Sequence, residues 1–224
     1  MSLELDDFLI TGRTFEEYAA FFAFDAASMR NMRVLDCPGG ASSFVATAKS
    51  YGIVAKGCDI LYRYDLAALF LQGEKSIEKI YADTSWMAEN NFAFYHSIER
   101  HKEHRKGALE LFYTDYNTED YHFTELPRLP YKDESFDLIL SSHLLFVYDD
   151  KLDLAFHEAT ITEMLRVAKE VRIFPLVDYK NSHADKAQNL SPFAYEIAKK
   201  FGGEILKVDF EFQKNAGYMM RIRR

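Results

Sequence analysis

The sequence predicts an α/β fold, a three-layer sandwich with helices on both faces of a mostly parallel sheet. Three observations predict it. Residues 32–59 read as strand, turn, helix and strand, which is one βαβ unit. Two further apolar runs, 136–140 and 170–177, are separated by an amphipathic segment. Residues 204–212 and 217–222 alternate in polarity, which is typical of a terminal antiparallel hairpin.

Size and composition predict a single globular domain over residues 1–224. A chain of 224 residues can bury a sizeable core, and 48% hydrophobic with 28% charged residues is the balance of a soluble protein. No apolar run approaches ~20 residues and no basic-then-apolar leader opens the chain, so we expect no membrane span. Two cysteines, Cys37 and Cys58, indicate reduced thiols in a cytoplasmic protein rather than a disulfide framework.

The net charge of −8 argues against one class of partner. Broad electrostatic binding of nucleic acid needs clustered lysines and arginines that displace counterions, so we expect nucleic acid to be an unlikely partner. The acidic balance mildly favours a small or cationic substrate. Oligomeric state does not follow from the sequence.

The βαβ unit places a glycine turn at the end of its first strand. A short apolar run ends at Asp36, and Pro38, Gly39 and Gly40 then break the chain before a helix begins. The second strand of the unit ends at Asp59. Parallel strands collect ligands at their carboxyl ends, so these residues face one crevice.

Three interpretations compete for this crevice. A dinucleotide site needs G-x-G-x-x-G, but the turn has two glycines and a proline, and Asp36 would repel a nearby pyrophosphate. A ligand with a cationic amino or sulfonium group suits Asp36 better. A plain βαβ turn without a ligand is the third interpretation.

The stretch VLDCPGGAS, residues 34–42, resembles the first motif of the class I S-adenosylmethionine-dependent methyltransferases, (V/I)LD-x-G-x-G-x-G. Pro38 and Ser42 replace the first and third glycines of the motif, and Gly40 keeps the second. The resemblance implies that Asp36 and the 37–40 turn bind the cofactor. It also implies that Asp59 binds the ribose hydroxyls. Ile60 and Leu61 would flank the adenine, although each could equally be ordinary core.

A second stretch is similar to the same family. LPYKDESFD, residues 129–137, matches the loop before the fourth strand of these enzymes, and EMLRV, residues 163–167, matches their E-x-x-R-V. The resemblance places Glu125 at the adenine amino group and lets Leu126 offer its backbone N–H to the ring. On its own, Glu125 would be interpreted as a surface acid at a strand end, because 121–126 alternates like a strand.

The N-terminal segment predicts an amphipathic helix. Thr14 and Glu17 form a capping box, and the apolar residues after it share one face. The helix would pack against the sheet. In related methyltransferases this segment also closes over the methionine end of the cofactor, which would bring Arg13 or Tyr18 to its carboxylate.

Residues 84–118 predict a helical insertion that covers the active site as a lid. Its basic run, 100–106, has three interpretations: a solvated helix face, a contact for an anionic substrate, or a contact for nucleic acid. His101 and His104 lie three residues apart, but no acid or cysteine completes a metal set, so we expect no metal.

The fourth strand, 136–140, ends at Ser141, Ser142 and His143, again at a carboxyl edge where sheets collect ligands, so we expect these residues beside the cofactor. His143 is the candidate general base, because imidazole titrates near neutrality; it could instead line the pocket or bond within its loop. Tyr148 and Asp149 are weaker candidates. Asp150 is expected to cap the next helix. The final strand pair is expected to turn at 213–216.

The resemblance spans nearly the whole chain and implies a seven-stranded sheet in the order 3-2-1-4-5-7-6. It implies S-adenosylmethionine (SAM) as cofactor and in-line methyl transfer, which depends mainly on positioning. Amino-group methylases carry (N/D)-P-P-(Y/F) after the fourth strand; here the sequence is Ser-Ser-His-Leu, and a small-molecule acceptor is left by subtraction. The alternatives are a catalytically silent SAM-binding protein, an RNA methyltransferase that uses the basic insertion, and an NAD-dependent oxidoreductase.

Overall fold

A computed structural model describes residues 9–83, 87, 90–177 and 190–224. Its strands are β1 (Arg33–Asp36), β2 (Val54–Asp59), β3 (Tyr121–Phe123), β4 (Phe136–Ser142), β5 (Ala168–Phe174), β6 (Glu204–Lys207) and β7 (Tyr218–Arg223). They form one sheet in the order β3-β2-β1-β4-β5-β7-β6. The strands β1 to β5 pair in parallel, and β7 runs antiparallel to both β5 and β6. The predicted strand order and terminal hairpin are therefore confirmed.

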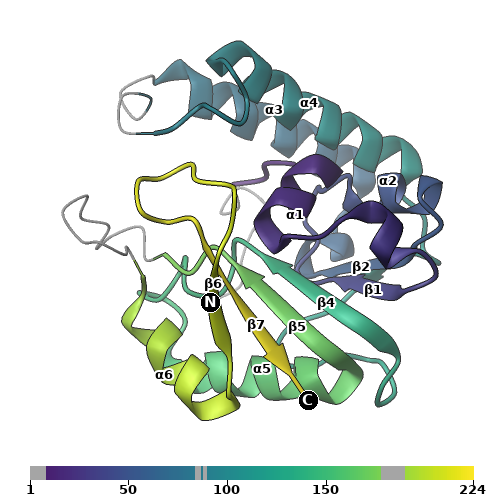
Figure 1. The fold of residues 1–224 in the computed structure, drawn as a ribbon. Helices are drawn as coiled ribbons and strands as arrows, with labels where there is room; N and C mark the ends of the chain where they lie inside the picture. Colours follow the sequence, from purple (N-terminus) through teal and green to yellow (C-terminus); the bar gives the residue numbers. More distant parts are fainter. Residues whose placement is uncertain (1–8, 84–86, 88–89, 178–189) are drawn as a thin grey trace.

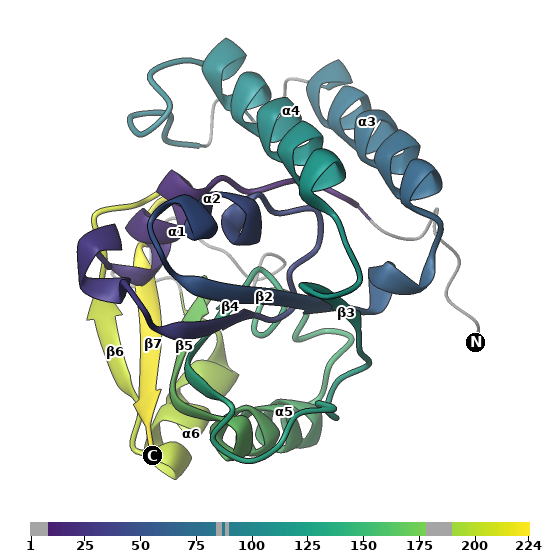
Figure 2. The same cartoon turned by 90° about the vertical axis from the view of Figure 1, so that its right-hand side faces the viewer.

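Helices cover both faces of the sheet (Figure 1). The helices are α1 (Phe15–Phe22), α2 (Phe44–Ser50), α3 (Leu66–Ala82), α4 (Ile98–Asp115), α5 (Leu154–Val167) and α6 (Pro192–Phe201). The helices α5 and α6 lie on one face, and α1 and α2 lie on the other (Figures 1 and 2). The pair α3 and α4 packs outside α2, so this side of the sandwich is two helices deep (Figure 2).

The helix ends follow local sequence signals. Thr14 and Glu17 form the predicted capping box: the Thr14 N–H donates to Glu17 at 2.8 Å, and the Glu17 N–H donates to the Thr14 hydroxyl at 3.3 Å. Ser191 caps α6, and Pro192 follows it at the first helical position. The cap of α5 was predicted wrongly. It is Asp153, not Asp150, whose carboxylate accepts from the Phe156 N–H at 2.8 Å.

Register brings the carboxyl ends of the central strands together. Asp36 at the end of β1 pairs with Gly57 of β2 on one side and with Leu140 of β4 on the other. The strands β2 and β4 each continue two residues further, to Asp59 and Ser142. The β1 turn is thus flanked by two longer strand ends, which makes a recess at this edge of the sheet.

Several strand boundaries differ from the prediction, and one difference shapes the site. The strand β3 ends at Phe123 rather than at 126, so Glu125 lies in a loop, and β4 continues to Ser142. The strand β5 ends at Phe174, three residues early. The strand β6 ends at Lys207 instead of 212, and residues 208–217 leave the sheet as an excursion. Their backbone pairs instead with the segment before α4: the Asn91 N–H donates to the Phe212 carbonyl at 2.7 Å. The expected 213–216 turn is therefore only the tip of a longer loop.

The predicted helical insertion, 84–118, contains α4; residues 84–86 and 88–89 lie outside the described residues. No described helix has the length and apolar content that a membrane crossing needs.

Candidate functional site

A cavity of about 570 Å³, here the first cavity, opens at the carboxyl edge of β1, β2, β3 and β4. The predicted site residues that line it are Cys37, Pro38, Gly39, Gly40, Asp59, Ile60, Leu61, Glu125, Leu126, Ser142 and His143. Two predicted residues, Asp36 and Ser141, do not line it. The structure therefore brings most of the predicted site together around one hollow.

The 37–43 turn needs glycine at two positions. Gly40 has a φ of +53°, a conformation that residues with a Cβ rarely adopt. A Cβ on Gly39 would lie 2.6 Å from the hydroxyl oxygen of Tyr62. That hydroxyl donates to the Gly40 carbonyl at 2.8 Å, so Tyr62 fixes the turn in place. Of these two glycines only Gly40 aligns with a glycine of the family motif; Gly39 lies between motif glycines, and Pro38 and Ser42 depart from the motif.

Asp59 presents a preorganised carboxylate to the first cavity. One oxygen accepts from the Gly40 N–H at 2.7 Å and the other from the Leu61 N–H at 2.8 Å. Burial raises the pKa of Asp59 to about 6, against these backbone hydrogen bonds, which lower it. At pH 7 the carboxylate is therefore mostly ionised. Each oxygen keeps a lone-pair site, so the group can accept two further hydroxyl donors.

Asp36 lies beneath the cavity rather than in its wall. It is 1% exposed, and its Oδ1 accepts from the Tyr18 hydroxyl at 2.8 Å. Burial raises the pKa of Asp36 well above its usual range. Tyr18 itself lines the first cavity. Tyr18 therefore lies in the cavity wall, and Asp36 holds its hydroxyl from beneath.

Ser141 is likewise buried, because it lies one residue before the end of β4, inside the sheet. Its hydroxyl has no hydrogen-bond partner among the described residues. Cys37 and Cys58 are free thiols, and both are buried in the cavity wall. Within the described part of the chain, no three His, Cys, Asp or Glu side chains gather closely enough to hold a metal ion.

The loop after β3 carries Glu125 and Leu126 along the rim of the first cavity, where Glu125 is exposed. The family-like EMLRV stretch explains how the following loop is held. Glu163 accepts from the Leu129 N–H at 2.9 Å. Arg166 donates to the carbonyls of Leu129 at 3.1 Å and Tyr131 at 2.9 Å. Glu163 and Arg166 of α5 therefore hold the backbone of residues 129–131, which follows the rim residues, in place.

His143 follows the last residue of β4 and turns away from the strand with a φ of +57°. Its backbone N–H donates to the Phe174 carbonyl at 2.8 Å, and its ring Nδ1 lies 2.6 Å from the Ser142 hydroxyl. Burial of the ring, with the nearby cations Arg13 and Arg105, lowers the pKa of His143 well below its usual value. The imidazole is therefore neutral at pH 7.

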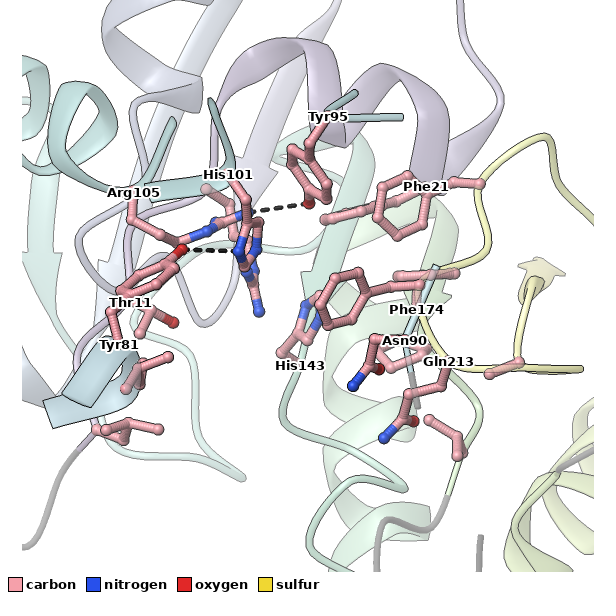
Figure 3. A pocket seen from close by; sticks show the side chains of 18 of the residues that line it. Thr11, Phe21, Tyr81, Asn90, Tyr95, His101, Arg105, His143, Phe174 and Gln213 are labelled. Atoms are coloured by element: carbon pink, nitrogen blue, oxygen red, sulfur yellow. Dashed lines mark hydrogen bonds between the residues drawn. The ribbon is translucent and has the colours of Figure 1, made fainter. Parts of the chain in front are cut away.

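A larger cavity of about 790 Å³, here the second cavity, adjoins the first. The residues that line both are Leu9, Thr11, Arg13 and His143. In Figure 3, Thr11, Tyr81 and Arg105 lie on one side of it, Phe21, Phe174 and Gln213 lie on the other, and His143 lies between. His143 thus stands where the two cavities meet.

Most residues of the second cavity were not predicted. They come from the ends of α1, α3 and β5, the insertion and the 208–217 excursion, which are far apart in sequence. The aromatic residues of the insertion and the C-terminal alternation were visible in the sequence. Their convergence was not, because it depends on where residues 208–217 leave the sheet.

A buried ion pair joins the insertion to the N-terminal segment. Arg105 of α4 pairs with Glu17 of α1 and donates to the Gly12 carbonyl; its guanidinium lies 3.0 Å from the Tyr95 hydroxyl. Burial opposes ionisation of Glu17, but the Arg105 cation outweighs it and lowers the pKa of Glu17 to about 2.

The basic run at 100–106 is therefore not a uniformly solvated helix face. Arg105 and His101 are buried, and both line the second cavity. Lys102 and Lys106 face outward and pair with Glu78 of α3, at 3.1 Å and 3.3 Å. The run serves partly to pack the insertion and partly to bind the two outer helices together.

The chain is similar along nearly its whole length to a known protein. The uncharacterized protein MJ0045 of Methanocaldococcus jannaschii is 30% identical over 226 residues, which covers 99% of each chain. No protein-family model matches the sequence.

One solved structure with a similar fold is a SAM-dependent methyltransferase from Aquifex aeolicus. The two sequences are 14% identical, the match covers 99% of this chain and 97% of that chain, and the TM-score is 0.42. Another is the magnesium protoporphyrin IX methyltransferase of Synechocystis with bound SAM, with 11% identity, coverage of 94% and 78%, and a TM-score of 0.47. At these values the likeness extends to the fold alone.

Proposed function

Because the chain belongs to the same family as MJ0045 and has the fold of the class I SAM-dependent methyltransferases, we propose that it transfers a methyl group from SAM to a small-molecule acceptor. One observation carries the proposal. The cavity at the carboxyl ends of the central strands meets a second cavity at His143, so that a methyl donor and an acceptor would lie on either side of one neutral imidazole.

The first cavity fits the adenosine part of the cofactor. Asp59 has two lone-pair sites left for the two ribose hydroxyls, beyond the two backbone hydrogen bonds that orient it. Ile60 and Leu61 would flank the adenine, with the Glu125 carboxylate at its amino group and the Leu126 N–H at the ring. The 37–40 turn would lie beside the methionine part, and Asp36 would act through Tyr18.

The chemistry asked of the protein is positioning and proton removal. When bound, the cofactor supplies a methyl group activated by the sulfonium. His143 is neutral and accessible from both cavities, so it can accept the proton of the acceptor. With its Nδ1–H donated to the Ser142 hydroxyl, its Nε2 lone pair is available for that proton.

The second cavity also argues against the main alternative function, SAM binding without catalysis. A protein that binds SAM without catalysis has no use for an acceptor pocket beneath the insertion. Here Tyr95, His101 and Arg105 of the insertion line a cavity of about 790 Å³. The ion pairs of Lys102 and Lys106 with Glu78 leave less of the basic run for RNA. Both observations favour a small-molecule methyltransferase.

The experiment is a transfer assay with methyl-labelled SAM and the small-molecule fraction of a cell extract. We expect a labelled small molecule, detected by mass spectrometry, together with stoichiometric S-adenosylhomocysteine. The His143→Gln variant is the matched control and should bind S-adenosylhomocysteine while forming far less product. Binding without any labelled product would support the silent alternative, and no binding by the wild type would refute the proposal.

A further inference from the structure

The chemistry of the second cavity indicates what it would hold, an inference that rests on the function proposed above. Its volume of about 790 Å³ lies within the range of roughly 300–1,000 Å³ typical of pockets for drug-sized ligands. An acceptor of only a few atoms would leave most of it to water. The cavity therefore fits an acceptor of at least two fused rings in size.

Aromatic rings form much of its apolar wall. Phe21 stacks on Phe174 with the ring centroids 4.5 Å apart, and Phe210 meets Phe21 edge-on at 4.6 Å. The ring of Phe212 stacks with that of His101 at 5.1 Å. Flat rings gain offset-stacked or edge-to-face contacts with such walls, whereas saturated rings do not. The wall thus favours a planar aromatic guest.

Charge in the lining argues against a cationic guest. The charged lining residues are three cations and one acid, namely Arg13, Lys79, Arg105 and Asp83. Glu17, which does not line the cavity, pairs with both arginines, so the cations exceed the acids by one. Burial and the two arginines lower the pKa of His101 to about 3, and they lower that of His143 well below its usual value. A cavity that resists the protonation of two imidazoles also disfavours an ammonium group and stabilises an oxyanion.

A buried hydrogen-bond acceptor lies on the side of the second cavity that residues 208–217 form. Gln213 Oε1 is buried and has no hydrogen-bond partner among the described residues. The backbones of Gln213 and Asn90 pair as an isolated bridge, which fixes this side of the wall. Buried polar atoms without partners are uncommon in folded proteins, and because Gln213 lines the second cavity, rotation of its carboxamide would present this oxygen to a ligand that donates to it. Figure 3 shows the carboxamide beside that of Asn90.

We propose that the acceptor is a planar aromatic compound, neutral or anionic, whose ring hydroxyl lies at His143 and whose far edge donates a hydrogen bond to Gln213 Oε1. In the transfer, the hydroxyl oxygen forms a bond to the methyl carbon while the bond from that carbon to sulfur breaks. The sulfur keeps the electron pair of the broken bond. The hydroxyl proton passes by way of Nε2 of His143 directly to water, because Arg13 and Arg105 disfavour a lasting imidazolium and stabilise the oxyanion of the acceptor.

The experiment separates this proposal from the proposed function. Calorimetry with S-adenosylhomocysteine reports on the first cavity alone. Three matched probes then test the second cavity, with and without S-adenosylhomocysteine: 2-naphthol, its cationic analogue 2-naphthylmethylamine, and the saturated decahydro-2-naphthol. We expect 2-naphthol to bind about tenfold more tightly than either analogue.

Two variants keep the test independent of folding defects. Phe210→Leu and Phe212→Leu each remove one ring but keep an apolar side chain, and Phe212 is only half-buried. Each should weaken 2-naphthol binding about tenfold and leave S-adenosylhomocysteine affinity unchanged. The control is Tyr195→Ala, at a position 50% exposed on the opposite face of the sheet.

Equal or tighter binding of the cationic or the saturated probe would overturn the proposal, as would 2-naphthol affinity that neither ring variant changes. If S-adenosylhomocysteine fails to bind while the preference for 2-naphthol holds, the proposed function fails and the chemistry of the cavity stands.

Discussion

The role of Asp59 leads to a prediction about ligand affinity that a change of pH and a mutation both test. The ionised carboxylate is the form that can accept both ribose hydroxyls, and burial sets its pKa at about 6. Acidification should therefore weaken the binding of S-adenosylhomocysteine below pH 6. The Asp59→Ala variant should bind weakly at every pH, because the titrating group is gone.

The size of both effects follows from the site. With a pKa of about 6, about a tenth of Asp59 is ionised at pH 5, so affinity there should be about tenfold below its plateau above pH 7. Loss of two hydrogen bonds to a charged acceptor costs about 3 kcal/mol or more, which is about 100-fold in affinity. The affinity of the Asp59→Ala variant should then change little between pH 5 and 8.

Calorimetry at four pH values between 5 and 8 measures both effects. Adenosine serves as a second ligand, because it lacks the amino acid group but keeps the ribose. Glu196→Ala removes an exposed acid on α6 and is the control for the change in net charge. A wild-type affinity that stays flat to pH 5, or an Asp59→Ala affinity equal to that of the wild type, would refute the ribose assignment.

Three other predictions test the site and its supports. Arg105→Met should lower the free energy of unfolding in urea by about 3 kcal/mol, because the buried Glu17 carboxylate loses its nearest cation and keeps only Arg13, 3.9 Å away. Adding Glu17→Gln should restore part of this loss, and Arg100→Met on the same helix should cost little; equal losses for the two arginines would contradict the argument. His143→Gln should lower kcat about 100-fold with unchanged affinity for S-adenosylhomocysteine, and a kcat near that of the wild type would exclude the base. Tyr18→Phe should cost about 1–3 kcal/mol in the same unfolding assay, because a buried acceptor loses its donor; no measurable loss would mean that the hydrogen bond is unimportant.

Local signals made much of the fold predictable. The turn at Gly39 and Gly40, the capping box at Thr14 and the proline after Ser191 each fix backbone geometry within a few residues. The family resemblance then supplied the strand order, which no local pattern contains. Ten predicted cofactor-binding residues line one cavity, because parallel strands bring their carboxyl ends to the same edge.

Burial and long-range pairing were less accessible from the sequence. Asp36 looked like a cofactor ligand because it ends a strand beside a glycine turn, yet the Tyr18 hydroxyl reaches it from another element and covers it. Arg105 belongs to a run of charged residues that is typical of a solvated helix face, but it is buried because it pairs with the Glu17 carboxylate of α1. Such pairings depend on helix placement, which periodicity does not give.

The second cavity shows the same limit. The alternation over 204–212 predicted a continued strand, and nothing in that pattern marks the departure at Lys207. The backbone of Phe212 finds its partner at Asn91, about 120 positions away in the chain, so the wall that it forms belongs to the tertiary structure alone.

The most direct test of the central claim is a crystal structure with S-adenosylhomocysteine bound. We expect both ribose hydroxyls within hydrogen-bond distance of the Asp59 carboxylate and the sulfur facing His143 at the mouth of the second cavity. A ligand bound elsewhere, or one whose sulfur points away from His143, would contradict it.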